Sequence, residues 1–189
     1  IAWLLNIRGG DVKHTPVPHS FATLATDGQV DLFIDRRKLS PEVEAHLGNG
    51  VRIRAPEELA QALDDLGAAG KKVLADPSTA SAWVFDRLTK AGAAIVRGVD
   101  PCLLPKACKN PVEVQGIRNA HERDGAALTR FIRWLKAEGP SEKYTEIEAC
   151  EKLEDFRRET GALKDLSFDS ISGAGSDGAI VHYRVTRRT

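Results

Sequence analysis

The pattern of apolar and polar residues between positions 20 and 100 alternates between short β-prone runs and helical runs. The pair Asp27-Gly28 joins two β-prone runs, 21–26 and 30–35, which is a strong short-range signal for a hairpin. Further strands are predicted at 51–54, 72–75 and 93–97, and helices are predicted to begin after Ser40, at Pro56, and after Ser78 or Thr79. Strands that alternate with helices predict an α/β layer, to which the hairpin adds an antiparallel element.

The pattern changes near residue 105, where Pro101, Pro105 and Pro111 interrupt the chain. We therefore expect two domains, 1–108 and 109–189. In the second, Asn110 is a predicted N-cap, so a long helix should run from Pro111 until a Gly-Pro pair ends it. A second helix is expected up to about residue 158, with a capping box formed by Thr145 and Glu148. Apolar residues at three- and four-residue steps mark the faces expected to be buried: Ile117, Ala120, Ala127, Leu128, Phe131, Ile132 and Leu135 in the first helix, and Ile147, Cys150, Leu153 and Phe156 in the second.

Residues 166–183 combine a β-prone run, a glycine-rich turn and a histidine. Residues 166–171 and 179–181 are expected to pair as a β-hairpin around a tight connection that contains Gly173, Gly175 and Gly178. His182 follows the second strand, and histidine suits proton transfer because its ordinary pKa lies near neutrality. On the residues alone, an ordinary surface histidine is the favoured interpretation, since a single histidine carries little information.

Composition narrows the classes of partner and compartment. The chain has 27 basic and 27 acidic residues, so its formal net charge is zero, which argues against nucleic acid or an anionic membrane as a partner. No apolar run is long enough to span a bilayer. An odd number of cysteines, three in a chain of 189 residues, indicates a reducing compartment, and we expect a cytoplasmic protein.

Histidines elsewhere in the chain do not have the spacing of metal ligands. His14 and His19 are separated by prolines, and His121 with Asp124 offers two donors on one predicted helix. No metal ligands are therefore assigned to these residues. His14 and His19 are interpreted as solvent-facing loop residues, and His121 and Asp124 as part of a solvated or interdomain face.

Four motifs give the chain a family resemblance. Residues 167–183 resemble the Ser-Phe-x-x-Ile … His-Tyr segment of Xaa-Pro aminopeptidases, the aminopeptidase P group of the pita-bread metallopeptidases. Residues 109–126 and 145–157 resemble the first two helices of the catalytic domain in that family. Residues 1–17 resemble the start of the middle domain of its three-domain members, with Gly10 where a residue such as serine is usual.

The resemblance implies a fold of class α/β (α+β). Residues 1–108 would form a creatinase-N-terminal-type α/β domain, and residues 109–189 the incomplete start of a pita-bread domain, with two helices and a β-hairpin. His182 would line the active site and hold the substrate or transition state as a catalytic residue without binding metal. The family's metal ligands (two Asp, one His and two Glu) follow the His-Tyr pair. A dinuclear manganese site is thus expected in the complete parent enzyme, with none bound by this chain.

The resemblance also implies a function: removal of the N-terminal residue from peptides with proline in second position, by a homodimeric cytoplasmic parent. This chain is expected to be a fragment that is inactive alone and exposes apolar surface beyond residue 110. Two alternatives stay open. One is a metal-free hydrolase of the creatinase type, and the other is a non-catalytic dimerisation or interaction module derived from the peptidase.

Overall fold

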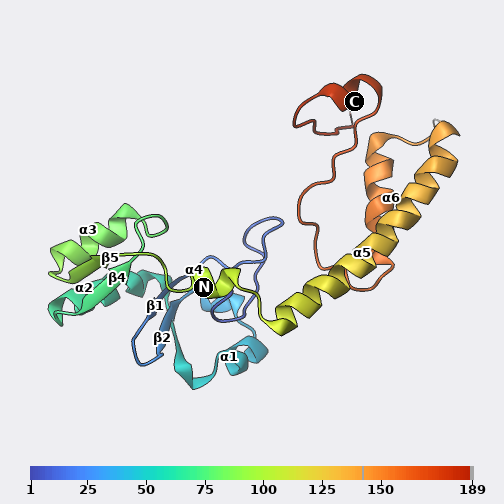
Figure 1. The fold of residues 1–189 in the computed structure, drawn as a ribbon. Helices are drawn as coiled ribbons and strands as arrows, with labels where there is room; N and C mark the ends of the chain where they lie inside the picture. The colour runs from blue at the N-terminus through green and yellow to red at the C-terminus, as the bar shows by residue number, and fades with distance from the viewer. Residues whose placement is uncertain (142, 188–189) are drawn as a thin grey trace. The chain divides into compact units, whose positions relative to one another are not determined.

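The computed structural model describes residues 1–141 and 143–187, and the chain divides into two compact units, Ile1–Cys108 and Lys109–Thr189 (Figure 1). The first unit contains the strands. β1 (Phe21–Leu24) runs antiparallel to β2 (Val30–Phe33), which runs parallel to β3 (Val51–Arg54). β4 (Lys72–Ala75) and β5 (Ala94–Arg97) form a second, parallel pair. The predicted Asp-Gly hairpin and the three later strands are confirmed.

Of the three longer α-helices in the first unit, the first begins with a side-chain cap and the other two begin without one. α1 (Pro41–Leu47) begins where the Ser40 hydroxyl accepts the Val43 N–H, and α2 (Leu59–Ala68) follows a 3-10 turn, Pro56–Glu58. α3 (Ala82–Lys90) begins later than predicted, because the Asp76 carboxylate accepts the N–H groups of Ser78 (2.8 Å) and Asp100 (2.9 Å) and holds the chain in a turn. A short helix, α4 (Leu103–Ala107), lies in the segment that Pro101, Pro105 and Pro111 interrupt.

The core of the first unit is built on both faces of β2. On one face Phe33 packs against α2 and α3, with Leu59, Leu63 and Leu88 as buried partners. On the other face lie Leu32 and Ile34, next to two buried residues from outside the sheet, Ile7 and Leu47. Burying a large apolar side chain is worth about 1.5–3 kcal/mol, so these two clusters account for the cohesion of the unit.

The second unit is an antiparallel helix pair followed by an irregular segment. α5 (Pro111–Glu138) and α6 (Glu146–Arg158) both begin with capping boxes. The box of Thr145 with Glu148 was predicted, and at Asn110 the predicted N-cap proves to be a full box with Glu113. Two ion pairs connect the helices: Arg157 with Asp124 (2.6 Å), and Arg130 of α5 with Glu159 just after α6 (2.5 Å). Trp134 stacks beside Phe131, with ring centroids 5.9 Å apart.

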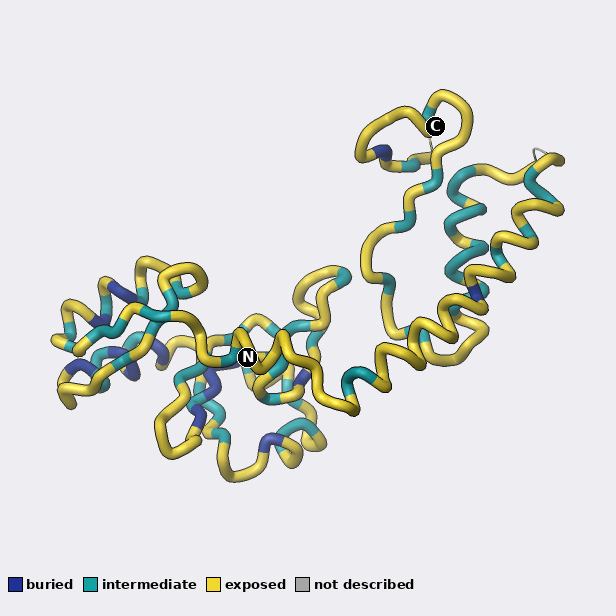
Figure 2. The backbone as a smooth tube through the Cα atoms, viewed as in Figure 1, coloured by how far each residue is buried: buried dark blue, intermediate teal, exposed yellow. Residues whose placement is uncertain are grey.

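Burial in the second unit is sparse, as the largely exposed α5 in Figure 2 shows. Ala127 is the buried residue of α5, whereas four larger apolar residues of this helix that were expected in a buried face are exposed: Ile117, Leu128, Ile132 and Leu135. These four residues, here called the α5 apolar face, lie at spacings that place them on one side of the helix. The expectation of exposed apolar surface beyond residue 110 is confirmed. Among the described residues, no helix combines the length and the hydropathy needed to cross a membrane.

The β-hairpin predicted within residues 166–181 is wrong. The described backbone there has no strand and instead contains a 3-10 helix, η5 (Gly175–Ala179). A two-stranded hairpin is marginally stable unless a third strand or a helix supports it. Here the apolar side chains of neither run are buried against a strand or a helix, since Phe168, Ile171, Ile180 and Val181 are all exposed. The segment is therefore held by side-chain contacts to α6 in place of a strand ladder.

Candidate functional site

The candidate site is the segment that carries His182, residues 167–183, here called the His182 segment. Its glycine-rich part is tight, as the sequence predicted. A Cβ atom on Gly173 would lie 3.0 Å from the Cα of Gly178, and Gly175 has a φ of +54°. The close approach of these backbones allows the chain to turn back through η5 toward His182.

His182 lies in a turn and has a left-handed backbone. The Tyr183 N–H donates to the Ile180 carbonyl (3.2 Å), which places His182 third in a four-residue turn. Its φ is +56°, a conformation that residues other than glycine and asparagine adopt at a cost of roughly 1 kcal/mol or more. The imidazole is exposed, and within residues 1–141 and 143–187 it has no hydrogen-bond partner.

Tyr183, the next residue, is buried and anchored. Its side chain is 7% exposed, and its hydroxyl donates to the Glu146 carboxylate (2.5 Å), with Asp177 as a second acceptor at 3.3 Å. The other Glu146 oxygen accepts the Ala174 N–H (2.5 Å). The backbone on both sides of η5 is thus tied to the first residue of α6.

A second contact to α6 lies one helical turn further along. The Cys150 thiol donates to the Ser170 carbonyl at 3.6 Å. Burial raises the pKa of the Cys150 thiol, and the charges of Glu146 and Glu151 raise it further, so the thiol stays protonated as a donor at neutral pH. Because Glu146 and Cys150 are four residues apart, one face of α6 carries the whole segment.

The sequence nominated His182, but it gave no signal for Glu146 and Asp177, which accept hydrogen bonds from the His182 segment. In the sequence, Glu146 is an acidic residue in the first turn of a predicted helix, where its charge interacts favourably with the helix dipole. Its contacts reach 28 and 37 residues along the chain, and no local pattern signals contacts at such separations.

The other candidate residues are not brought together. The His121 ring nitrogen Nδ1 lies 2.9 Å from the Ile117 carbonyl, and Asp124 pairs with Arg157. Across the part of the chain that the structure describes, no three His, Cys, Asp or Glu side chains form a group that could hold a metal ion. The described residues therefore do not fit a dinuclear metal centre.

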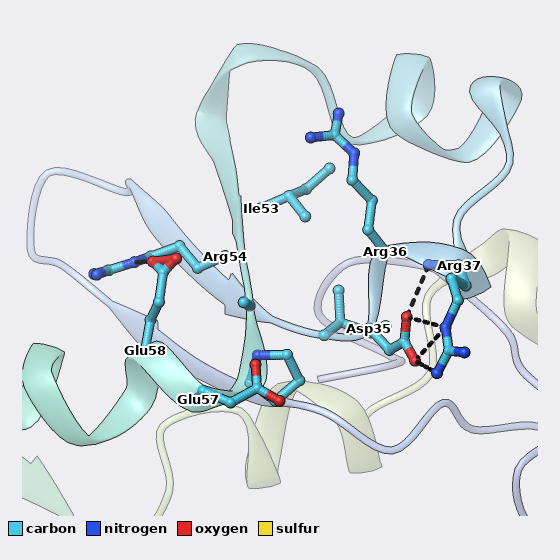
Figure 3. Close-up of a pocket in the computed structure, with 10 residues that line it drawn as sticks. Asp35, Arg36, Arg37, Ile53, Arg54, Glu57 and Glu58 are labelled. Atoms are coloured by element: carbon cyan, nitrogen blue, oxygen red, sulfur yellow. Dashed lines mark hydrogen bonds and ion pairs between the residues drawn. The ribbon is translucent and has the colours of Figure 1, made fainter.

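A separate cavity of about 500 Å³ opens in the first unit, at the carboxyl ends of the parallel strands β2 and β3 (Figure 3). The carboxyl end of parallel strands is a common place for ligands. However, its three arginines are already paired: Arg37 with Asp35 (2.6 Å), Arg36 with Glu44 (2.9 Å), and Arg54 with Glu58 (2.8 Å). The hydrogen bond from the Arg37 guanidinium lowers the pKa of Asp35 to about 2, so this pair stays ionised at neutral pH. We interpret this cavity as part of the scaffold.

Two family models together match almost the whole chain. The model described as "Creatinase/Prolidase N-terminal domain" matches residues 1–113, and "Metallopeptidase family M24" matches residues 115–189.

Curated relatives with similar sequences carry aminopeptidase names. "Probable Xaa-Pro aminopeptidase P" of Aspergillus niger is 42% identical over 97% of this chain. "Xaa-Pro aminopeptidase 1" of Dictyostelium discoideum is 36% identical over 100% of it, and "Aminopeptidase P2" of Arabidopsis thaliana is 34% identical over 97%. The chain spans about 30% of the length of these relatives.

A solved structure is similar over most of the chain. It is the X-prolyl aminopeptidase of Caenorhabditis elegans, described as a cytosolic enzyme with a di-nuclear active site. The match has a TM-score of 0.79 at 33% identity and covers 90% of this chain and 28% of that one. The fold of these residues is therefore that of the corresponding part of an X-prolyl aminopeptidase.

Proposed function

This chain belongs to the creatinase/prolidase N-terminal domain family, and we propose that it is part of a metal-dependent Xaa-Pro aminopeptidase. Such an enzyme removes the N-terminal residue from peptides that have proline in second position. The observation that carries the proposal is the 34–42% identity to proteins with aminopeptidase P names over 97–100% of this chain. Both compact units fall within this alignment.

We assign the two units different parts of that enzyme. Residues 1–108 are proposed to be the creatinase-N-terminal-type middle domain, and residues 109–189 the N-terminal portion of the pita-bread catalytic domain. The paired charges of the cavity beside Asp35 support a scaffold role for the first unit. The second unit then contributes His182 to the active site.

His182 is proposed to hydrogen-bond the substrate and to stabilise the oxygen that becomes negative in the tetrahedral transition state. Three observations support this role. The imidazole is exposed, and it makes no hydrogen bond to another described residue. It also lies in a turn with a strained backbone, and strained backbone conformations are common at active sites.

The metal centre is proposed to be supplied by the part of the enzyme that these residues do not include. We propose manganese as the metal, a cytoplasmic location and a homodimer for the complete enzyme. The similar enzyme from C. elegans is described as cytosolic with a di-nuclear active site. This description supports a cytoplasmic location and a site with two metal ions, and it does not name the metal. The 189-residue chain alone is expected to be inactive.

A chimeric enzyme tests the proposal. The aligned segment of the Aspergillus niger relative is replaced by this chain, and hydrolysis of an Xaa-Pro peptide is measured with Mn²⁺ and with a chelator, beside the 189-residue chain alone. We expect manganese-dependent activity from the chimera and none from the chain alone. In the chimera, His182→Ala should lower kcat by about 10²–10³-fold, which is the usual effect of losing a donor to a developing oxyanion.

His121→Ala is the matched control, because His121 is an exposed histidine of the same unit that binds its own helix. It should leave kcat unchanged. Activity of the chain alone would contradict the proposed location of the metal centre. A chimera that folds, binds manganese and still cleaves no Xaa-Pro peptide would favour the creatinase-like or the non-catalytic alternative.

A further inference from the structure

We propose that Glu146 is a positioning residue for His182. Its carboxylate fixes the turn that presents the imidazole, although Glu146 itself does not touch the substrate. The inference rests on the proposed function, in which His182 faces the substrate.

The geometry of the Glu146 carboxylate carries the inference. One oxygen accepts the N–H of Ala174, just before η5, and the other accepts the hydroxyl of Tyr183, after it. Both oxygens are used by donors from the two ends of one loop, so the carboxylate closes that loop as a clamp. Hydrogen bonds to an ionised carboxylate are about twice as strong as neutral ones.

The helix that bears the clamp is itself well fixed. Glu146 is the first residue of α6 and follows Thr145, whose capping box with Glu148 orders this end of the helix. Cys150 holds Ser170 one turn further along. A site is held accurately when its supporting residues lie on rigid elements with satisfied hydrogen bonds, and α6 meets that condition.

His182 needs such support because its backbone is strained. A histidine at φ +56° persists only where the surrounding structure fixes it. The imidazole has no hydrogen-bond partner of its own in the described part of the chain, so its position follows from the backbone. The nearest fixed point is the buried Tyr183, and Tyr183 is fixed by Glu146.

Backbone NMR relaxation on the 189-residue chain tests the clamp without requiring activity. In the unsubstituted chain we expect the His182 amide to have an order parameter near 0.85, as in rigid backbone, and in Glu146→Ala and Tyr183→Phe one below about 0.6. Glu146→Gln is the conservative variant. Its amide oxygen can accept the Ala174 N–H and its NH₂ can donate to the Tyr183 oxygen, so we expect the order parameter to recover.

Two controls separate positioning from loss of the fold. Glu151→Ala removes an exposed carboxylate from the same helix and should leave His182 unchanged. In every variant the amides of Leu153 and Phe156 should stay rigid, which shows that α6 is intact. An order parameter at His182 that stays high in both Glu146→Ala and Tyr183→Phe overturns the inference, and so does equal loss of order in His182 and in α6.

Kinetics in the chimeric enzyme supply the functional readout. Glu146→Ala and Tyr183→Phe should each lower kcat by about 10–100-fold with little change in KM, the expected effect of misplacing a catalytic group, and Glu146→Gln should restore most of it. The double variant should lose no more than the worse single one, because both act through one contact. Unchanged kcat beside lost order overturns the inference, whereas an inactive unsubstituted chimera counts against the proposed function and leaves the NMR result to decide on the clamp.

Discussion

At the scale of single residues, the His182 segment depends on the absence of a side chain at Gly173. A Cβ atom there would lie 3.0 Å from the Gly178 Cα and 3.1 Å from the Asp177 carbonyl oxygen, both backbone atoms that cannot rotate away. We expect Gly173→Ala to push η5 outward and, through Asp177 and Tyr183, to loosen the turn at His182. Limited proteolysis should then cut residues 174–183 at least several-fold faster than in the unsubstituted chain.

Gly116→Ala is the matched control for this prediction. Gly116 lies inside α5 with open space around its Cα, so alanine there should stabilise the helix by about 0.5–1 kcal/mol. If Gly173→Ala leaves the segment as resistant to protease as Gly116→Ala does, the close approach of Gly173 and Gly178 is not needed to hold it.

At the scale of elements, the start of α6 affects both the stability of this helix and the proposed site, because Glu146 at its first position contacts the His182 segment. The Thr145 hydroxyl accepts the Glu148 N–H (3.2 Å), and Thr145→Ala removes that acceptor, so we expect a loss of about 1 kcal/mol in helix stability. Hydrogen exchange of the α6 amides measures it, since the chain has two compact units and one melting curve would mix them. Thr145→Ser keeps the hydroxyl and should match the unsubstituted chain. Equal exchange in the alanine and serine variants would show that the cap contributes nothing.

The two hairpin predictions show what a sequence can and cannot specify at this scale. Both rested on β-prone runs around glycine, yet only the one at Asp27-Gly28 formed. Its second strand, β2, is also paired with β3. The side chain of Phe33 on one face of β2 and that of Leu32 on the other are both buried in core clusters. Local patterns contain the turn signal and the strand propensity, but they do not contain the supporting neighbours. Residues 166–181 lack such neighbours in this structure and follow a different path.

The capping boxes and the candidate site illustrate the same division. The N-cap at Asn110 and the box at Thr145 were predicted because each lies within four residues of the sequence. His182 could be nominated only through its motif. The contact of Glu146 with Tyr183 joins residues 37 positions apart and emerges only when α6 and the His182 segment are placed together.

At the scale of the whole molecule, the two units differ in how completely they are packed. The first has two buried clusters around β2, whereas α5 in the second has Ala127 as its buried residue. The residues of the α5 apolar face are 39–45% exposed, and exposed apolar residues grouped on one side of a helix are a mark of an interaction surface. The relatives are much longer than this chain, so the proposed function supplies an occupant for the face: the rest of the catalytic domain.

That assignment predicts opposite outcomes for one pair of substitutions in two settings. In the 189-residue chain, Leu128→Lys with Ile132→Lys should change the stability of α5 by no more than about 1 kcal/mol, because each site is a surface position worth about 0.5 kcal/mol or less. Binding of a hydrophobic dye should fall by about half or more. In the chimeric enzyme the same pair would bury two charges, so we expect a loss of several kcal/mol and of most activity.

Leu74→Lys, at a position 49% exposed in the first unit, is the control and should be tolerated in both settings. If the lysine pair unfolds α5 in the chain alone, the face is already covered there, and a second copy of the chain is its occupant. If the pair is tolerated in an active chimera, the face lies on the outside of the complete enzyme. The difference between the two settings therefore identifies what covers α5.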